Sequence, residues 1–256
     1  MKDLFSVEGK RVLVTGGSRG IGLMIAQGFV ANGARVYISS RKADTCEEVA
    51  AELSKEGTCV ALPADLATQA ECDRLGAELA SREDGLEVLV NNAGANWGAP
   101  LEEFPDSAWD KVLALNVKSV FHLTRACLPL LEKAGTAEDP ARVINIGSID
   151  GIQVPMLDTF SYSASKAAVH QLTRVLARKL ADRHVTVNAV APGPFESKMM
   201  AATLDQFGDE IAASAPRGRI GTPEDMAGVA IYLASRAGAY VTGAIIPVDG
   251  GIATTK

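Results

Sequence analysis

The sequence predicts one doubly wound α/β domain, in which a seven-stranded, mostly parallel sheet carries helices on both faces. Short β-branched segments alternate with longer helical patterns along the whole chain. Several of the short segments are almost continuously apolar, as expected of strands that are covered on both sides. The 256 residues, 47% of them apolar, are enough to build one large core.

Seven segments have the length and composition of strands, and six helical patterns separate or follow them. The expected strands are 11–15, 35–39, 58–62, 86–90, 142–146, 185–190 and 244–248. The expected helices are 21–32, 43–56, 68–82, about 107–133, about 159–182 and 223–235. Thr222 followed by Pro223 is typical of a helix start, because threonine caps well and proline tolerates the first helical position. Right-handed crossovers then place helices on both sides of the sheet.

The stretch 193–221 is the least regular part of the chain. It follows the sixth expected strand, so it begins at the carboxyl edge of the sheet, where ligands of such folds bind. We expect residues 1–256 to form a single dinucleotide-binding catalytic domain, with 193–221 as a lid over the substrate.

Composition excludes several classes of function. The net charge is −6 and no basic block is present, so nothing indicates a nucleic-acid partner. The four cysteines have no CxxC spacing and the three histidines form no ligand motif, so we expect reduced thiols and no metal. We find neither a signal-peptide pattern nor 18 consecutive apolar residues, and we expect a cytoplasmic protein without a membrane span.

A glycine-rich turn follows the first strand and opens the first helix. Gly16, Gly20 and Gly22 give the spacing GxxxGxG in "VTGGSRGIG". Glycines let the backbone turn sharply and let a pyrophosphate approach the amides at the helix N-terminus. A turn of this kind without any ligand is the alternative reading of this motif.

The end of the second strand indicates which dinucleotide is bound. A NAD site usually places an acid there to accept hydrogen bonds from the ribose 2′-hydroxyl. Here Ser40 and Arg41 occupy that region, and Arg19 lies inside the glycine turn. An arginine attracts a 2′-phosphate that an acid would repel. We therefore expect NADP(H); the alternative is that both arginines are solvated surface residues.

Eight short motifs occur in a characteristic order. They are "TGGSRGIG" (15–22), "ADL" (64–66), "NNAG" (91–94), "LNV" (115–117), "NIGS" (145–148), "YSASK" (162–166), "APG" (191–193) and "VDGG" (248–251). With them the chain resembles the short-chain dehydrogenases/reductases, a family with a Rossmann-type fold, over essentially its whole length. Within that family it is most similar to NADPH-dependent 3-oxoacyl reductases, including the rhamnolipid-associated branch, and sugar-acid dehydrogenases look slightly more distant.

The resemblance implies the site residues position by position. The catalytic four of the family match Asn116, Ser148, Tyr162 and Lys166. Besides Tyr162 and Lys166, the implied cofactor-binding residues are Gly16, Ser18, Arg19, Gly20, Ile21, Gly22, Ser40, Arg41, Asp65, Leu66, Asn92, Ala93, Gly94, Pro192, Gly193 and Ser197. One position departs from the family, since Ser197 stands where a threonine often contacts the carboxamide.

The chemistry of these residues follows from their types and spacing. Tyr162 and Lys166 are four apart, so they share one face of a helix. An ammonium nearby favours phenolate, and we therefore expect Lys166 to lower the pKa of Tyr162 and make it a general acid and base. Ser148 ends a strand and can donate to a carbonyl oxygen that gains negative charge. The family match gives Asn116 a role in holding water for a proton relay from Lys166.

Three functions remain open from the sequence. The first is NADPH-dependent reduction of a ketone, with 3-oxoacyl thioesters or similar bulky carbonyls as substrates. The second is an NADP-dependent secondary-alcohol or sugar-acid dehydrogenase of the gluconate type, and the third is a catalytically silent dinucleotide sensor or scaffold. Apolar residues on loops around the expected cleft favour the first: Trp97, Met156, Phe195, Met199, Met200 and Phe207. The family resemblance also implies a homotetramer.

Overall fold

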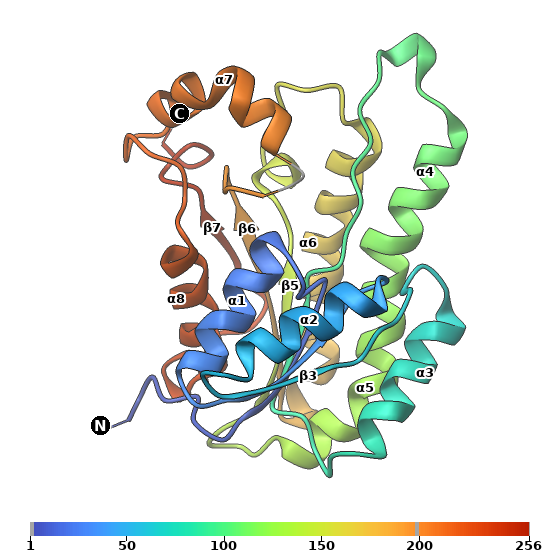
Figure 1. Cartoon of the computed structure of the whole chain (residues 1–256), viewed down its shortest axis with the longest axis vertical. Helices are drawn as coiled ribbons and strands as arrows, with labels where there is room; N and C mark the ends of the chain where they lie inside the picture. The colour runs from blue at the N-terminus through green and yellow to red at the C-terminus, as the bar shows by residue number, and fades with distance from the viewer. Residues whose placement is uncertain (1–2, 198–199, 256) are drawn as a thin grey trace.

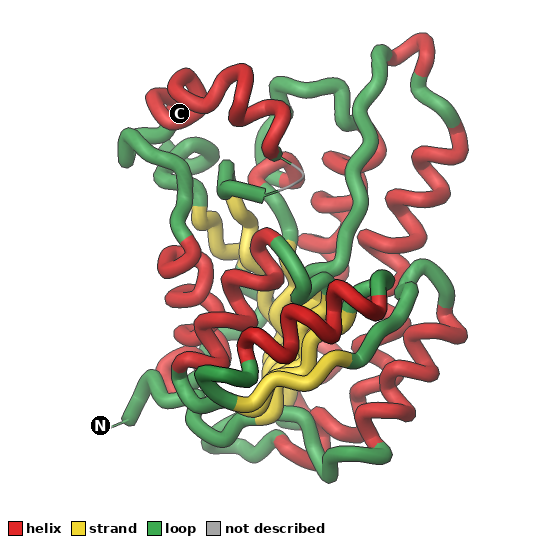
Figure 2. Tube along the Cα trace, in the orientation of Figure 1, coloured by secondary structure: helices red, strands yellow, loops and turns green. Residues whose placement is uncertain are grey.

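Seven parallel strands form the sheet at the centre of the computed structural model, which describes residues 3–197 and 200–255 (Figures 1 and 2). The strands are β1 (Arg11–Thr15), β2 (Arg35–Ser39), β3 (Thr58–Ala61), β4 (Val88–Asn91), β5 (Ala141–Ile146), β6 (Val185–Pro192) and β7 (Ile245–Val248). Their order is β3-β2-β1-β4-β5-β6-β7, and all six pairings are parallel. The chain runs outward from the centre in both directions, which confirms the predicted doubly wound fold.

Helices cover both faces of this sheet (Figure 1). They are α1 (Gly20–Ala31), α2 (Ala43–Leu53), α3 (Gln69–Ala80), α4 (Asp106–Leu113), α5 (Ser119–Ala134), α6 (Phe160–Leu180), α7 (Ala201–Ser214) and α8 (Pro223–Ala234). One core joins the sheet to α1, α2 and α8, and a second joins it to α3, α5 and α6. The strands supply both cores alternately, as Val143 and Ile144 do in β5. This is why their sequences read as continuous apolar runs.

Two segments differ from the sequence-based expectation. The helix expected over about 107–133 is interrupted by one turn of π-helix at Ala114–Lys118, between α4 and α5. The irregular stretch 193–221 contains α7, whose backbone leaves helical geometry at Phe207 (φ −132°, ψ 17°). None of the described side chains of α7 is fully buried, so this helix lacks the apolar stripe by which core helices are recognised.

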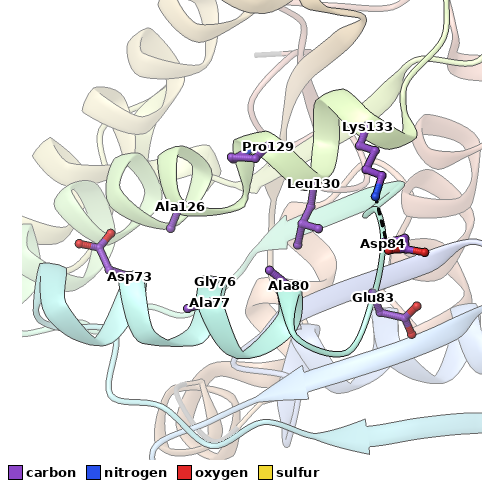
Figure 3. A pocket seen from close by; sticks show the side chains of 10 residues that line it. All are labelled: Asp73, Gly76, Ala77, Ala80, Glu83, Asp84, Ala126, Pro129, Leu130 and Lys133. Atoms are coloured by element: carbon purple, nitrogen blue, oxygen red, sulfur yellow. Dashed lines mark hydrogen bonds and ion pairs between the residues drawn. The ribbon is translucent and has the colours of Figure 1, made fainter.

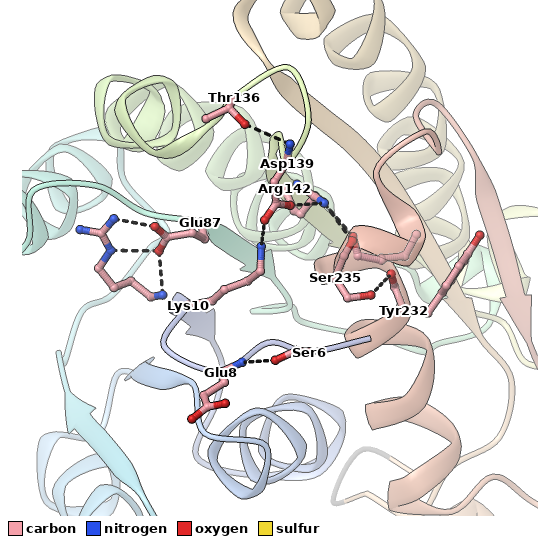
Figure 4. A network of polar contacts seen from close by, with 11 residues as sticks. Ser6, Glu8, Lys10, Glu87, Thr136, Asp139, Arg142, Tyr232 and Ser235 are labelled. Carbon is pink, nitrogen blue, oxygen red and sulfur yellow. Dashed lines mark hydrogen bonds and ion pairs between the residues drawn. The ribbon is translucent and has the colours of Figure 1, made fainter. Parts of the chain in front are cut away.

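Buried Arg142 connects β5 to the end of α8 (Figure 4). Its side chain is 1% exposed. Its Nε donates to the carbonyl of Leu233 (3.1 Å) and its Nη2 to the carbonyl of Ser235 (2.8 Å). Asp139 pairs with both Arg142 (2.8 Å) and Lys10 (2.7 Å). The guanidinium thus satisfies carbonyls that the helix end leaves without intrahelical partners.

Candidate active site

The carboxyl ends of β1, β4, β5 and β6 lie beside one another in the sheet. β2 and β3 lie on one side of β1, whereas β4 lies on the other side, so the order in which strands are added to the sheet reverses at β1. Such a switch point leaves a crevice at the carboxyl edge, where open α/β sheets bind ligands. The glycine turn, the loop after β4, Ser148 and the 192–193 turn all meet at this edge.

The glycine turn is held in a conformation that excludes side chains. Gly16 and Gly20 have φ of +64° and +52°, in the left-handed region that favours glycine. A Cβ on Gly22 would lie 2.3 Å from the carbonyl oxygen of Gly16. The amide of Gly16 donates to Ser39 at the end of β2 (2.7 Å). Helix α1 begins at this turn without a side-chain cap from Arg19, so its first amides remain available to an anion.

The loop after β4 packs directly against this turn. The hydroxyl of Thr15 accepts hydrogen bonds from the amides of Asn92 (2.9 Å) and Ala93 (3.0 Å) and donates to Val90 (3.2 Å). The side-chain amide of Asn92 donates to the carbonyl of Thr15 (2.8 Å). Thr15 is 1% exposed and braces both loops, a role that the sequence analysis did not assign to it. Its position directly before Gly16 in the motif is the signal that could have identified it.

The residues expected at the adenosine end lie at the carboxyl ends of β2 and β3. Ser40 is half-buried, and its carbonyl accepts from the amide of Ala64 (3.1 Å). Asp65 closes a short turn by accepting from the amide of Ala67 (3.3 Å), and Leu66 is buried. These contacts place the "ADL" motif beside the end of β2.

Arg19 and Arg41 are both exposed. Neither guanidinium group forms a hydrogen bond or an ion pair with another residue of the ranges 3–197 and 200–255. No carboxylate follows β2 before Asp44. Two uncommitted guanidinium groups, uncapped helix amides and a turn without side chains fit a dinucleotide that carries a 2′-phosphate.

Ser148, Tyr162 and Lys166 come together at the carboxyl end of β5. Ser148 follows this strand and is 7% exposed, and its hydroxyl accepts from the amide of Asp150 (3.1 Å). Lys166 is 5% exposed; its ammonium donates to the carbonyl of Ile146 (2.8 Å) and lies 5.4 Å from the centroid of the Tyr162 ring. Helix α6 therefore presents both side chains to the strand end that carries Ser148.

Burial is the largest cause of the pKa shifts of Tyr162 and Lys166. It raises the pKa of Tyr162 to about 12, against a smaller lowering by the Ser148 hydroxyl, and Asp150 raises it further. Burial also lowers the pKa of Lys166 to about 8, opposed by Asp150. The net shift of the Tyr162 pKa is therefore upward, opposite to the expected lowering, because burial of the phenol is its largest cause. At neutral pH the phenol keeps its proton.

Asn116 lies within the π-turn, and its side chain is fully engaged. Its Oδ1 accepts from the amide of Ala95 (2.8 Å), and its Nδ2 donates to the carbonyl of Ala95 (3.0 Å) and to the hydroxyl of Ser165 (2.9 Å). It thus holds the loop after β4 against α6. A Cβ on Gly94 would lie 3.3 Å from Asn116 Oδ1 and 3.8 Å from Lys166 Nζ, so this loop passes close to both residues.

The turn after β6 closes the edge from the other side. The amide of Gly193 donates to Val248 at the end of β7 (3.0 Å), and a Cβ there would lie 2.7 Å from the Cβ of Asp249. This contact explains why "APG" and "VDGG" occur together. Ser197 lies beside Gly20: a Cβ added to that glycine would lie 3.2 Å from the Cβ of Ser197.

The expected apolar cleft residues differ in exposure. Phe195 does not line a cleft: it is 2% exposed and its ring fills the space over Gly221, where a Cβ would lie 2.2 Å from it. Trp97, Met156 and Phe207 are exposed, whereas Met200 is half-buried. Met199 lies outside the described residues. The segment 152–157 adds Ile152, Val154 and Leu157 as exposed apolar side chains just beyond Ser148.

One cavity adjoins this region of the fold, and another lies away from it. A cavity of about 770 Å³ between α1 and α7 includes Gly20 and Ser197 in its wall, so it opens onto the glycine turn. A second, of about 430 Å³, lies between α3 and α5 (Figure 3). None of the predicted site residues lines the second cavity.

Within residues 3–197 and 200–255, no group of three or more histidine, cysteine or acidic side chains is arranged to hold a metal ion. Over the same ranges, no helix combines the length and apolarity needed to cross a bilayer.

Comparison with known proteins gives matches over the whole chain. A family model described as enoyl-(acyl carrier protein) reductase matches residues 16–253. A rhamnolipids biosynthesis 3-oxoacyl-(acyl-carrier-protein) reductase of Pseudomonas aeruginosa is 51% identical over 253 residues, covering 98% of this chain and 99% of the relative. A 5-keto-D-gluconate 5-reductase of Escherichia coli is 35% identical and covers 98% of each chain.

Solved structures agree with the sequence matches. The Pseudomonas aeruginosa RhlG/NADP active-site complex has a TM-score of 0.95 at 50% identity, covering 99% of this chain and 100% of that chain. A gluconate 5-dehydrogenase from Burkholderia cenocepacia in complex with NADP and tartrate has a TM-score of 0.92 at 31% identity, covering 99% of each chain.

Proposed function

This chain belongs to the short-chain dehydrogenase/reductase family, and on that premise we propose that it uses NADPH to reduce a ketone to a secondary alcohol. The observation that carries the proposal is the convergence of Ser148, Tyr162 and Lys166 beside the glycine turn. A relative named as a 3-oxoacyl reductase is 51% identical over nearly the full length of both chains. The favoured substrate class is accordingly a 3-oxoacyl thioester or a similar bulky carbonyl.

NADPH, when bound, supplies the hydride that reaches the carbonyl carbon. Arg19 and Arg41 bind the 2′-phosphate, and the first amides of α1 bind the pyrophosphate. The remaining cofactor contacts assigned by the family match are Ser18, Ile21, Ser40, Asp65, Leu66, Asn92, Ala93, Gly94, Pro192, Gly193 and Ser197. Their placement around one edge of the sheet supports these assignments.

The catalytic side chains act on the carbonyl oxygen. Ser148 donates a hydrogen bond to this oxygen and stabilises the negative charge that develops there. Tyr162 donates the proton, because its phenol is protonated at neutral pH. The pKa raised by burial makes this phenol a weaker acid, so donation depends on positive charge beside the tyrosinate. Lys166 holds positive charge beside the tyrosinate that remains. Asn116 holds the loop after β4 in place, and the relay of protons through water near Asn116 and Lys166 remains a prediction.

The alternative functions have weaker support. A gluconate-type dehydrogenase would bind a polyhydroxy acid, yet the segment beyond Ser148 exposes Ile152, Val154 and Met156. Extended apolar patches of this kind mark surfaces that bind apolar groups. A silent sensor has no need of Ser148, Tyr162 and Lys166 in one place. The stretch 193–221 that contains α7 acts as the substrate lid.

The assembly and compartment belong to the same proposal. We infer a homotetramer, since Phe121 on α5, Val175 on α6 and Tyr240 near the carboxyl end of the chain are exposed apolar or aromatic residues. Sedimentation that shows only monomer at micromolar concentration would contradict it.

The four cysteines are buried free thiols, which supports a reducing cytoplasmic compartment.

The substrate class is tested with a panel of carbonyls. We expect 3-oxoacyl thioesters and bulky ketones to oxidise NADPH, followed by its absorbance, and NADH to be much poorer. The same enzyme is assayed with sugar acids and NADP⁺. Turnover of sugar acids without any reduction of thioesters or ketones would reject the proposal.

A further inference from the structure

Asp150 lies two residues after Ser148 and occupies a fixed place in the site. Its amide donates to the hydroxyl of Ser148 (3.1 Å), and its carbonyl accepts from the hydroxyl of Ser163 (2.5 Å), the residue after Tyr162. The next residue, Gly151, is pressed against α6, since a Cβ there would lie 2.7 Å from the backbone of both Lys166 and Ala167. The backbone of Asp150 therefore bridges the strand end and the helix that supply the reacting side chains.

The carboxylate of Asp150 is uncommitted, in contrast to its backbone. It forms no hydrogen bond or ion pair with any residue in the described ranges 3–197 and 200–255. The residue is half-buried, and burial raises the pKa of its carboxyl group, although Lys166 opposes this. The carboxylate in turn raises the pKa values of Tyr162 and Lys166. A partly buried carboxylate without a hydrogen-bond donor lowers the stability of the fold. A contribution to stability therefore does not explain why an aspartate stands at this position.

We propose that the carboxylate of Asp150 selects substrates by charge: it excludes ketones that carry a carboxylate close to the carbonyl and leaves neutral 3-oxo esters and thioesters unaffected. This inference rests on the proposed function, because it concerns the substrates of the same site. Like charges that approach in a cleft of low dielectric repel strongly, whereas a neutral ester has no net charge to be repelled. A charge that is left unpaired when an unwanted ligand binds is a common means by which proteins discriminate against that ligand.

Other charged groups near Asp150 do not cancel this selection. Lys166 is the cation that faces it, and its ammonium already donates to the carbonyl of Ile146. His170, on the same helix, lies under the 147–151 turn, and burial lowers its pKa to about 4. His170 is therefore neutral at pH 7, which leaves the carboxylate of Asp150 to repel an anionic ligand.

The test compares two probes that share the same 3-oxo acyl group, the neutral ester ethyl acetoacetate and the anion acetoacetate. We expect the parent enzyme with NADPH to favour the ester over the anion by at least roughly tenfold in kcat/KM. Asp150→Asn keeps the side-chain shape and should reduce this ratio at least about fivefold. An effect of the substitution on proton donation by Tyr162 acts on both probes and cancels in the ratio. Loss of the carboxylate also removes its raising effect on the Lys166 pKa, and a less charged Lys166 attracts the anion less, so this effect opposes the expected change in the ratio. Asp158→Asn, an exposed acid in the same loop, is the matched control and should leave the ratio within about twofold.

Two results would overturn the inference: a ratio in Asp150→Asn within twofold of the parent, or an equal change in Asp158→Asn. Failure of the proposed function is recognised separately, because thioesters would then not be reduced while the small probes still report the ratio. Should neither probe be reduced, saturation-transfer NMR of both probes on the NADP-loaded enzyme gives the ratio of their dissociation constants. The ratio of dissociation constants in Asp150→Asn must then differ from that of the parent by the same factor, at least about fivefold, in favour of the anion.

Discussion

The ammonium of Lys166 lies 5.4 Å from the centroid of the Tyr162 ring while it donates to the carbonyl of Ile146. One helical turn separates the two residues on α6, and the end of β5 fixes the lysine from the other side. The consequence is a buried pair in which tyrosine holds its proton more tightly than usual and lysine less tightly. A protonated phenol is a donor, which agrees with ketone reduction.

Tyr162→Phe removes that donor without changing the ring. We expect kcat for ketone reduction to fall by roughly 10²- to 10⁴-fold, the usual contribution of a positioned general acid. Fluorescence of bound NADPH should show that the cofactor still binds, with at most the loss of one contact from the Tyr162 hydroxyl. Tyr232→Phe is the matched control and should retain parental activity, because the Tyr232 hydroxyl forms no hydrogen bond within the described residues. Parental turnover in Tyr162→Phe would contradict the assigned role.

The pH profile of reduction should follow Lys166. Its pKa is lowered to about 8 by burial, so it loses its proton as the pH rises through 8, whereas Tyr162 stays protonated up to about 12. Neutral lysine no longer stabilises the tyrosinate left after proton donation. We expect kcat/KM, measured with saturating NADPH, to be flat near neutrality and to decline above about pH 8. A profile that stays level to pH 10 would disagree with this assignment.

Arg19 and Arg41 should determine cofactor choice. Replacing either with alanine removes a charge from the 2′-phosphate, and we expect KM for NADPH to rise roughly tenfold with little change for NADH. Initial rates with both cofactors measure this. Arg82→Ala is the control, because Arg82 pairs with Glu78 at the far end of α3. Equal losses with NADH and NADPH would indicate a general defect instead of a lost phosphate contact.

Arg142→Met should destabilise the fold. The carbonyls of Leu233 and Ser235 lose a buried donor, and we expect the free energy of unfolding to fall by roughly 2–4 kcal/mol. Denaturant titration measures the change. Arg183→Met, at an exposed pair with Glu132, is the comparison and should leave the denaturation midpoint almost unchanged. Similar midpoints for both variants would show that Arg142 does not brace α8.

The local sequence pattern was sufficient to predict the strands of the sheet and the ends of most helices. Val143 and Ile144 each contribute to a different core, and such doubly covered strands are apolar throughout. The π-turn around Asn116 was not predicted, because one extra residue in a helical turn leaves the apolar pattern almost unchanged. Helix α7 was missed for the opposite reason, since it buries none of its described side chains fully.

The sequence by itself determined the parallel sheet, the glycine turn and the side chains with donor or charge character at the strand ends. These depend on backbone preference and periodicity, which are local properties. Only the tertiary structure decided how proton affinities are distributed among Tyr162, Lys166 and Asp150. Burial and distance set those affinities, and both arise when strand, turn and helix meet. The sequence could place a phenol near an ammonium, but desolvation determined which of them loses its proton first as the pH rises.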